Sequence, residues 1–141
     1  MRDLLAHAAT LGVGVHVAHL PAPFRGFYDH ENLRVIYDFN LTPIERRSVV
    51  AHELGHAFYA HTQYGVQAHE DAANLYAARL LIDPAELAEL CRIYSCWDVV
   101  AEELRVERRL LDTFIAHDVR RLGPRTYVRG RLGTGQFRYA D

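Results

Sequence analysis

The chain has 141 residues and a formal net charge of −2, and 50% of its residues are hydrophobic and 24% charged. This composition suits one compact domain with a buried core, and the near-neutral charge gives no electrostatic case for nucleic-acid binding. No apolar run approaches the roughly 18 residues of a membrane span, and we expect the first residues, which include Asp3 and His7, to form a short helix rather than a signal sequence. Cys91 and Cys96 have the wrong spacing for a metal or redox pair. We therefore expect a reduced, cytoplasmic location without a membrane partner.

The first third of the chain alternates between helix and strand signals. We expect a helix near 2–11, a strand near 13–19, and a hairpin whose second arm covers 33–39. Next, Thr42-Pro43-Ile44-Glu45 forms a capping box with proline at the first helical position. The helical rhythm then continues to Phe58, so this segment predicts a helix of about four turns.

His52-Glu53-Leu54-Gly55-His56 lies in the middle of that predicted helix. Histidines four residues apart share a helix face, so both imidazoles can bind one tetrahedral metal ion. Glu53 projects beside them, where a carboxylate can act as general base toward a water molecule that zinc activates. This chemistry hydrolyses a peptide bond without a covalent intermediate. Gly55 costs about 1 kcal/mol relative to alanine inside a helix, which indicates that another segment packs closely there.

A zinc site of this type needs a third protein ligand, and the downstream candidates are His61, His69 and Glu70. His61 follows the motif by five residues, about 140° around a continuing helix, and would point away. Glu70 opens a second helical stretch over 70–81, and Asn74 lies one turn later on the same face. We therefore prefer Glu70 as the ligand, with His69 as the alternative, and Asn74 as a residue that orients one of the ligands by a hydrogen bond.

These motifs and their flanks resemble the ImmA/IrrE-type metallopeptidases. About 60 residues carry the resemblance, namely Gly26-Phe27-Tyr28-Asp29, Val35-Ile36-Tyr37-Asp38, Leu41-Thr42-Pro43, Glu45-Arg46-Arg47, His52-Glu53-Leu54-Gly55-His56, and a helix with Glu70, Ala73-Asn74, Tyr76-Ala77-Ala78, Leu80-Leu81-Ile82 and Pro84. Relatives often have aspartate at position 74 and phenylalanine at position 76, and both differences are mild.

The resemblance implies a fold class and a site. The fold would be α+β, a minimal zincin-like domain that is mostly helical, with a small antiparallel β-sheet packed beside the HExxH helix. The metal ligands would be His52, His56 and Glu70, as in gluzincins, with one Zn²⁺ per chain and Glu53 as catalytic base. Members of this family act on helix-turn-helix repressors.

The C-terminal half predicts three further helices. Asp83-Pro84 starts one that reaches about Tyr94, and the others cover 97–104 and 107–121. The last two are also typical of a helix-turn-helix, but acidic side chains there would oppose DNA phosphates, so we expect core-packing helices and no direct nucleic-acid binding. We expect one metallopeptidase domain over 1–122 and a partly ordered Arg/Gly-rich tail over 123–141. That tail is either a solvated terminus or a docking strip for an acidic partner or a nucleic-acid-bound repressor.

The sequence thus predicts a zinc-dependent endopeptidase that cuts a specific protein target. We expect a helix-turn-helix repressor or antitoxin of a phage or mobile element, supplied in trans because 141 residues leave no room for a further domain. Tyr64 or His61 is the candidate oxyanion stabiliser, and the strand over 33–39 is a candidate to pair with an extended substrate. The alternatives are a metal-binding module that sequesters its partner without cutting it, and a DNA-associated regulator.

Overall fold

A computed structural model describes residues 1–122 and 125–128. The chain forms two compact units, the first over 1–77 and the second beginning at residue 78. The boundary predicted between 122 and 123 stays a prediction. Residues 123–124 and 129–141 of the predicted tail lie outside the described part.

The first unit contains a small sheet that follows one helix. In chain order its elements are α1 (Arg2–Thr10), β1 (Gly14–Ala18), β2 (Gly26–Asp29) and β3 (Arg34–Asp38). The predicted hairpin is confirmed, since β2 and β3 pair antiparallel. However, β1 runs parallel to β3, with Val15 opposite Val35. The α+β class is confirmed. The sheet is mixed rather than wholly antiparallel, because the central strand β3 pairs parallel with β1 and antiparallel with β2.

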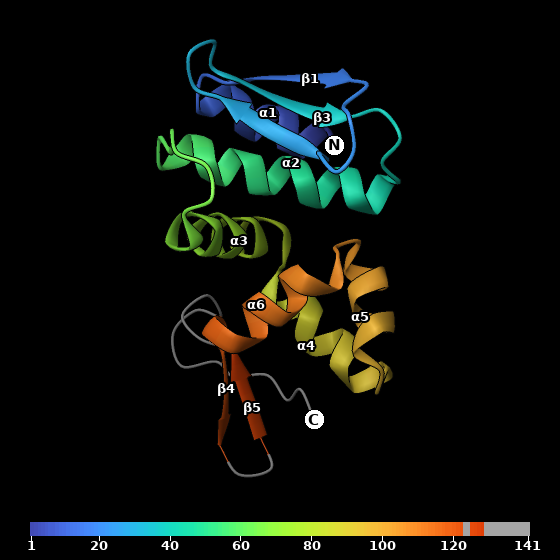
Figure 1. The fold of residues 1–141 in the computed structure, drawn as a ribbon. Coiled ribbons are helices and arrows are strands. Elements are labelled where there is room, and N and C mark those ends of the chain that lie inside the picture. Colours follow the sequence, from blue (N-terminus) through green and yellow to red (C-terminus); the bar gives the residue numbers. More distant parts are fainter. Residues whose placement is uncertain (123–124, 129–141) are drawn as a thin grey trace. The chain divides into compact units, whose positions relative to one another are not determined.

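The helix α2 (Pro43–Phe58) packs beneath this sheet, against β2 and β3 (Figure 1). Its first turn has the predicted capping box: the Glu45 N–H donates to Thr42 Oγ1 at 3.3 Å, and the Thr42 N–H donates to Glu45 Oε2 at 2.9 Å. A loop then leads to α3 (Gln67–Leu81), which starts three residues before the predicted position 70. The core of this unit is made of aliphatic side chains, including Leu4, Val35, Val50, Leu54 and Ala73.

The second unit contains further helices and a hairpin. They are α4 (Pro84–Ile93), α5 (Trp97–Leu104), α6 (Arg108–Asp118), β4 (Val119–Leu122) and β5 (Arg125–Val128). The helix predicted over 107–121 was too long. Asp118 is buried and accepts two hydrogen bonds from Arg79, at 2.8 and 2.7 Å. Beyond it the backbone pairs with β5, Val119 opposite Val128, instead of continuing the helix.

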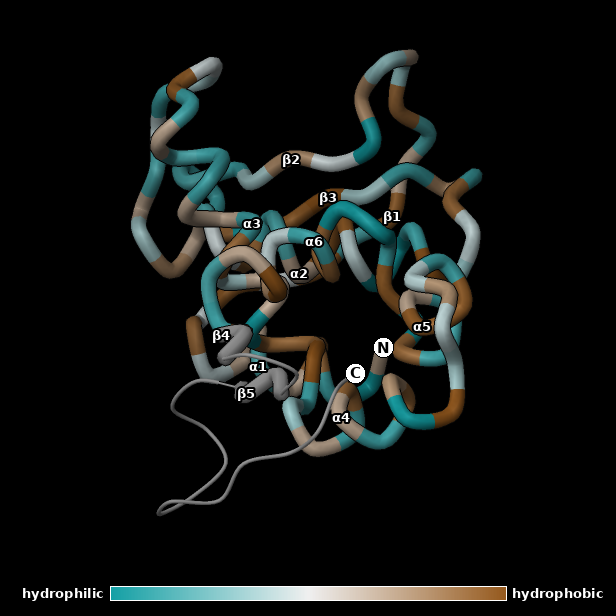
Figure 2. Tube along the Cα trace, turned by 90° about the horizontal axis from the view of Figure 1, so that it is seen from below, coloured by the Kyte–Doolittle hydropathy of each residue, from teal (hydrophilic) through white to brown (hydrophobic). Residues whose placement is uncertain are grey.

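The hydropathy pattern follows these elements. Figure 2 shows a hydrophobic stretch along β3, while hydrophilic and hydrophobic residues alternate along the helices. This is the pattern of helices with one buried face. Within the described ranges, no helix combines the length and apolar character needed to cross a membrane.

Candidate metal centre and active site

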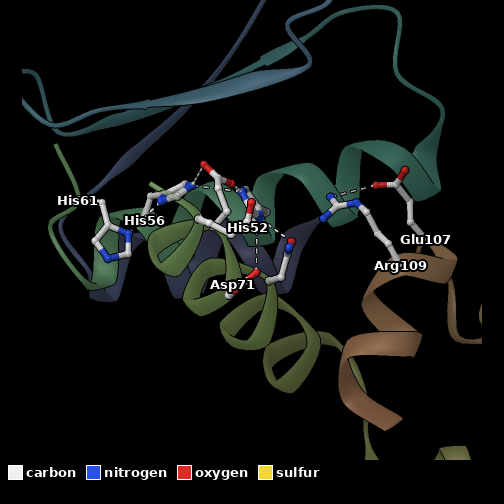
Figure 3. A network of polar contacts seen from close by, with 9 residues as sticks. His52, His56, His61, Asp71, Glu107 and Arg109 are labelled. Carbon is white, nitrogen blue, oxygen red and sulfur yellow. Dashed lines mark hydrogen bonds and ion pairs between the residues drawn. The ribbon is translucent and has the colours of Figure 1, made fainter. Parts of the chain in front are cut away.

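The HExxH motif occupies the second half of α2, as predicted. His52 and His56 lie one turn apart, with their ring centroids 4.7 Å apart and their Nε2 atoms 3.1 Å apart (Figure 3). Both side chains are 12% exposed, so they are held by their surroundings while one edge remains accessible. The helix thus presents two imidazole nitrogens to one point.

Gly55 explains how the next helix reaches that point. A Cβ atom built on Gly55 would lie 2.9 Å from Ala73 Cα and 3.0 Å from Ala73 O. Real Cβ atoms do not approach backbone so closely, so only glycine allows α3 to pack here. The close approach inferred from the sequence is therefore present, and its consequence is that Glu70 and Asn74, on either side of Ala73 in α3, reach His52.

Glu70 completes the cluster. Its Oε2 lies 2.9 Å from His52 Nε2, and its Oε1 lies 3.4 Å from His56 Nε2. Ligand atoms bound to one tetrahedral ion at about 2.0–2.1 Å are about 3.4 Å apart, so these separations fit a shared metal ion. Within the described ranges, His52, His56 and Glu70 are close enough to hold one, all ligand atoms lying within 4.8 Å. His69, the alternative ligand, is outside this group.

Asn74 orients the first imidazole. The His52 Nδ1–H donates to Asn74 Oδ1 at 2.8 Å, so the Nε2 lone pair faces Glu70 and His56. This is the supporting role proposed for Asn74 from its position one turn after Glu70. Second partners of this kind fix the tautomer and the direction of a metal-binding histidine.

The second imidazole has a different environment. Burial lowers the pKa of His56, with a further lowering by His52, whereas Glu70 acts in the opposite direction. Its Nδ1 lies 2.9 Å from His61 Nδ1. Burial also lowers the pKa of His61, with His69 and His56 adding to the effect. Both rings are thus biased toward the neutral form, the form in which an imidazole nitrogen binds a metal.

Glu53, the candidate general base, lies close to β2 of the sheet. It is 9% exposed and lies beneath β2, where a Cβ built on Gly26 would be 3.5 Å from Glu53 Cγ and 2.6 Å from Val49 Cγ1. Gly26 therefore allows β2 to cross directly over the catalytic candidate. No role in the site was predicted for Gly26, although it begins one of the segments that carry the family resemblance.

A cleft of about 750 Å³ opens over these residues. Its walls are the β2 segment, the motif, and the loop that follows α2. The lining residues are Phe24, Gly26, Phe27, Tyr28, Asp29, His30, Glu31, His52, Glu53, His56, His61, Thr62, Gln63, Tyr64 and Glu70. Glu53 and the three candidate ligands therefore line one open cleft.

Tyr64 and His61, the two oxyanion candidates, both line this cleft. Partial desolvation and then the negative charges of Glu53 and Asp29 raise the pKa of Tyr64. Its phenol therefore keeps its proton at neutral pH and can donate it in a hydrogen bond. The oxyanion role of each residue stays a prediction.

The family model described as the IrrE N-terminal-like domain, of the peptidase M78 family, matches residues 13–115. The match covers most of the chain and includes every residue of the cluster. The chain belongs to the peptidase M78 family. A comparison with curated proteins gives no significant match.

The M78 fold of this chain is also found in a solved structure titled "Mycobacterium tuberculosis transcriptional regulator". The two are 16% identical with a TM-score of 0.64, and the match covers 84% of this chain and 41% of that one. At this identity the likeness shows the fold alone. The present chain spans less than half the length of that regulator.

The order of strands in the sheet of this M78 domain shows that the strand predicted to pair with substrate was wrong. The strand predicted to pair with substrate, over 33–39, is β3, and β3 is the central strand with neighbours on both sides. Its backbone N–H and C=O groups already pair with β1 on one side and with β2 on the other. The strand with a free edge beside the cleft is β2, which in the described sheet pairs with β3 alone.

Proposed function

We propose that this M78 domain is a zinc-dependent endopeptidase that cuts one specific protein, a helix-turn-helix repressor or antitoxin supplied in trans. The observation that carries the proposal is the convergence of His52, His56 and Glu70 in an open cleft that also contains the Glu53 carboxylate. Two imidazoles and one carboxylate at tetrahedral spacing are the donor set of catalytic zinc sites, which keep a position open for water or substrate.

The metal and the protein would divide the chemistry between them. Zinc, when bound by the three ligands, polarises a carbonyl group and makes a nearby water molecule more acidic. Glu53 has the position to accept a proton from that water and then to donate it to the leaving nitrogen of the cut peptide bond. Glu53 is buried under β2 and lines the cleft, which supports this role.

The free edge of β2 supports binding of an extended peptide. Backbone N–H and C=O groups on an edge strand can pair with an added strand, which gives affinity independent of the peptide sequence. The target would therefore present an unfolded or loop segment of several residues. A substrate-analogue complex without main-chain hydrogen bonds to Gly26–Asp29 would exclude this binding mode.

The choice of a repressor as the target follows from the proteins that this chain resembles. The structural neighbour is titled a transcriptional regulator, and the resemblance to ImmA/IrrE-type proteins implies a repressor as target. A domain that only sequestered its partner would also relieve repression. The catalytic carboxylate distinguishes these two mechanisms.

Glu53→Gln tests the proposal. Because the amide keeps the shape of the side chain but cannot accept the proton, turnover should fall by about 10²–10⁴-fold. Zinc binding should remain, since Glu53 is not among the grouped ligands. The variant and the parent would each be co-expressed with a candidate helix-turn-helix repressor, and the repressor would be followed by mass spectrometry and a reporter.

The matched control is Glu89→Gln, a carboxylate on α4 whose side chain is 55% exposed and paired with Arg92. It should cleave as the parent does. If Glu53→Gln relieved repression as well as the parent while the repressor stayed intact, sequestration would replace proteolysis as the mechanism.

A further inference from the structure

We propose that His61 is a positioning residue for the metal site, whose Nδ1 accepts the Nδ1–H of His56 and so holds the second metal-binding imidazole. The inference rests on the proposed metal site and concerns how that site is built. The direct observation is the 2.9 Å separation between the two Nδ1 atoms (Figure 3).

The direction of this hydrogen bond follows from the other nitrogen of His56. Its Nε2 faces His52 Nε2 at 3.1 Å and Glu70 Oε1 at 3.4 Å, so Nε2 is the atom that meets the metal. A neutral imidazole that binds a metal through Nε2 carries its proton on Nδ1. His56 is therefore the donor, and His61 must offer the lone pair of its Nδ1.

The end of α2 places His61 at this position. A helix that continued past Phe58 would turn His61 away from the site, as predicted from the sequence. Instead, α2 ends at Phe58, and Ala60 has a left-handed backbone with φ 54°. The chain then turns back, and the His61 N–H donates to the His56 carbonyl at 2.9 Å. Such a left-handed turn is a common way to end a helix, and here it brings His61 back to His56.

Stacking holds the His61 ring in place. It lies parallel to the ring of His69, with 3.9 Å between centroids and 6° between planes. It also stacks with Tyr59, at 5.4 Å and 15°. Because His69 immediately precedes Glu70 on α3, His61 links the end of α2 to the start of the helix that supplies the third ligand.

The two metal-binding imidazoles thus have equivalent supports. His52 donates to Asn74 Oδ1 from α3, and His56 donates to His61 from the turn after α2. Loss of a support of this kind typically weakens metal binding 10–100-fold.

The test compares three variants by zinc affinity, measured by competition with a chromogenic chelator. His61→Leu should bind zinc about 10–100-fold more weakly than the parent. His61→Asn should restore most of that loss, because its Oδ1 can accept the same hydrogen bond. His16→Leu, which removes an exposed imidazole from β1, is the matched control and should bind zinc as the parent does.

Folding is checked by circular dichroism of each metal-free variant, and a second measurement covers the case in which His61→Leu fails to fold. In the zinc-loaded parent, ¹⁵N NMR of the imidazoles should show His56 Nδ1 protonated and His61 Nδ1 unprotonated. A protonated His61 Nδ1 would overturn the proposal.

Other outcomes are equally decisive. A folded His61→Leu with parental zinc affinity, or a folded His61→Asn as weak as His61→Leu, would show that His61 only fills space. These results would leave the proposed peptidase function intact, whereas a parent protein that binds no zinc would overturn that function itself.

Discussion

At the scale of single residues, the site depends on what supports each ligand. The imidazoles of α2 face the cluster with Nε2 because other side chains engage their Nδ1 atoms. A supporting role for Asn74 could be predicted, since Asn74 follows Glu70 by one helical turn. The support for His56 could not, because it depends on where α2 ends and on a left-handed residue, Ala60, that is not glycine.

Substitutions of Asn74 test the first support. Asn74→Leu keeps a similar volume but offers no acceptor to the His52 Nδ1–H, so zinc affinity should fall about 10–100-fold. Asn74→Asp retains an oxygen in the same place and should bind zinc at least as well as the parent. Chelator competition measures both, and equal affinities for the leucine and aspartate variants would contradict the assigned role.

At the scale of elements, the approach of α3 to α2 decides whether the cluster exists. The ligands come from two helices separated by a loop, so their distance is set by helix packing and not by chain spacing. Gly55 and Ala73 are the contact point, since a Cβ on Gly55 would fall within 3.2 Å of three Ala73 atoms.

Gly55→Ala tests this packing. Alanine would favour the helix itself by about 1 kcal/mol, but the new methyl group must displace the backbone of α3, and such overpacking costs about 1–3 kcal/mol. We expect a lower unfolding midpoint and weaker zinc binding, because Glu70 moves with α3. In Gly14→Ala the nearest atom is the flexible His16 Nε2 at 3.0 Å, so this control should leave zinc binding unchanged. Unchanged zinc affinity in Gly55→Ala would exclude the close-packing requirement.

Some elements could be predicted from the sequence and others could not. The capping box, the motif helix and the β2–β3 hairpin were predicted from local signals. The parallel pairing of β1 with β3 and the end of α6 at Asp118 were not, because both depend on distant partners: the order of strands in the sheet, and pairing with β5 together with Arg79. For the same reason, the strand predicted to pair with an extended substrate was β3, which is central, and not the edge strand β2.

At the scale of the whole molecule, the histidine cluster couples metal-free stability to pH. Folding lowers the pKa of His56 and of His61 below the ordinary value of 6.5, chiefly through burial. The unfolded chain therefore binds more protons than the folded one below that pH. Their contribution to stability is present above pH 6.5 and is lost as the pH falls through the lowered values.

We thus expect the urea midpoint of the metal-free protein to be steady between about pH 7 and 8 and to decrease below about pH 6.5. The Asp29 carboxyl, whose pKa is lowered chiefly by its hydrogen bond with Asn32, titrates below its usual 3.8 and does not interfere in this range. Circular dichroism in urea, with a chelator present, measures the midpoint. A midpoint that stays level to pH 5.5 would contradict the assigned burial of these rings.

The sequence by itself determined the chemistry of this protein: which residues can bind a metal, which carboxylate can act as base, and where their helices begin. These features follow from residue types at helical spacing, which are local properties of the chain. Only the tertiary structure decided that Glu70 rather than His69 meets the imidazoles, that β2 borders the cleft, and that His61 returns to His56. Each of these depends on how separate segments pack and turn. The spacing of the contacting residues along the chain does not predict such contacts.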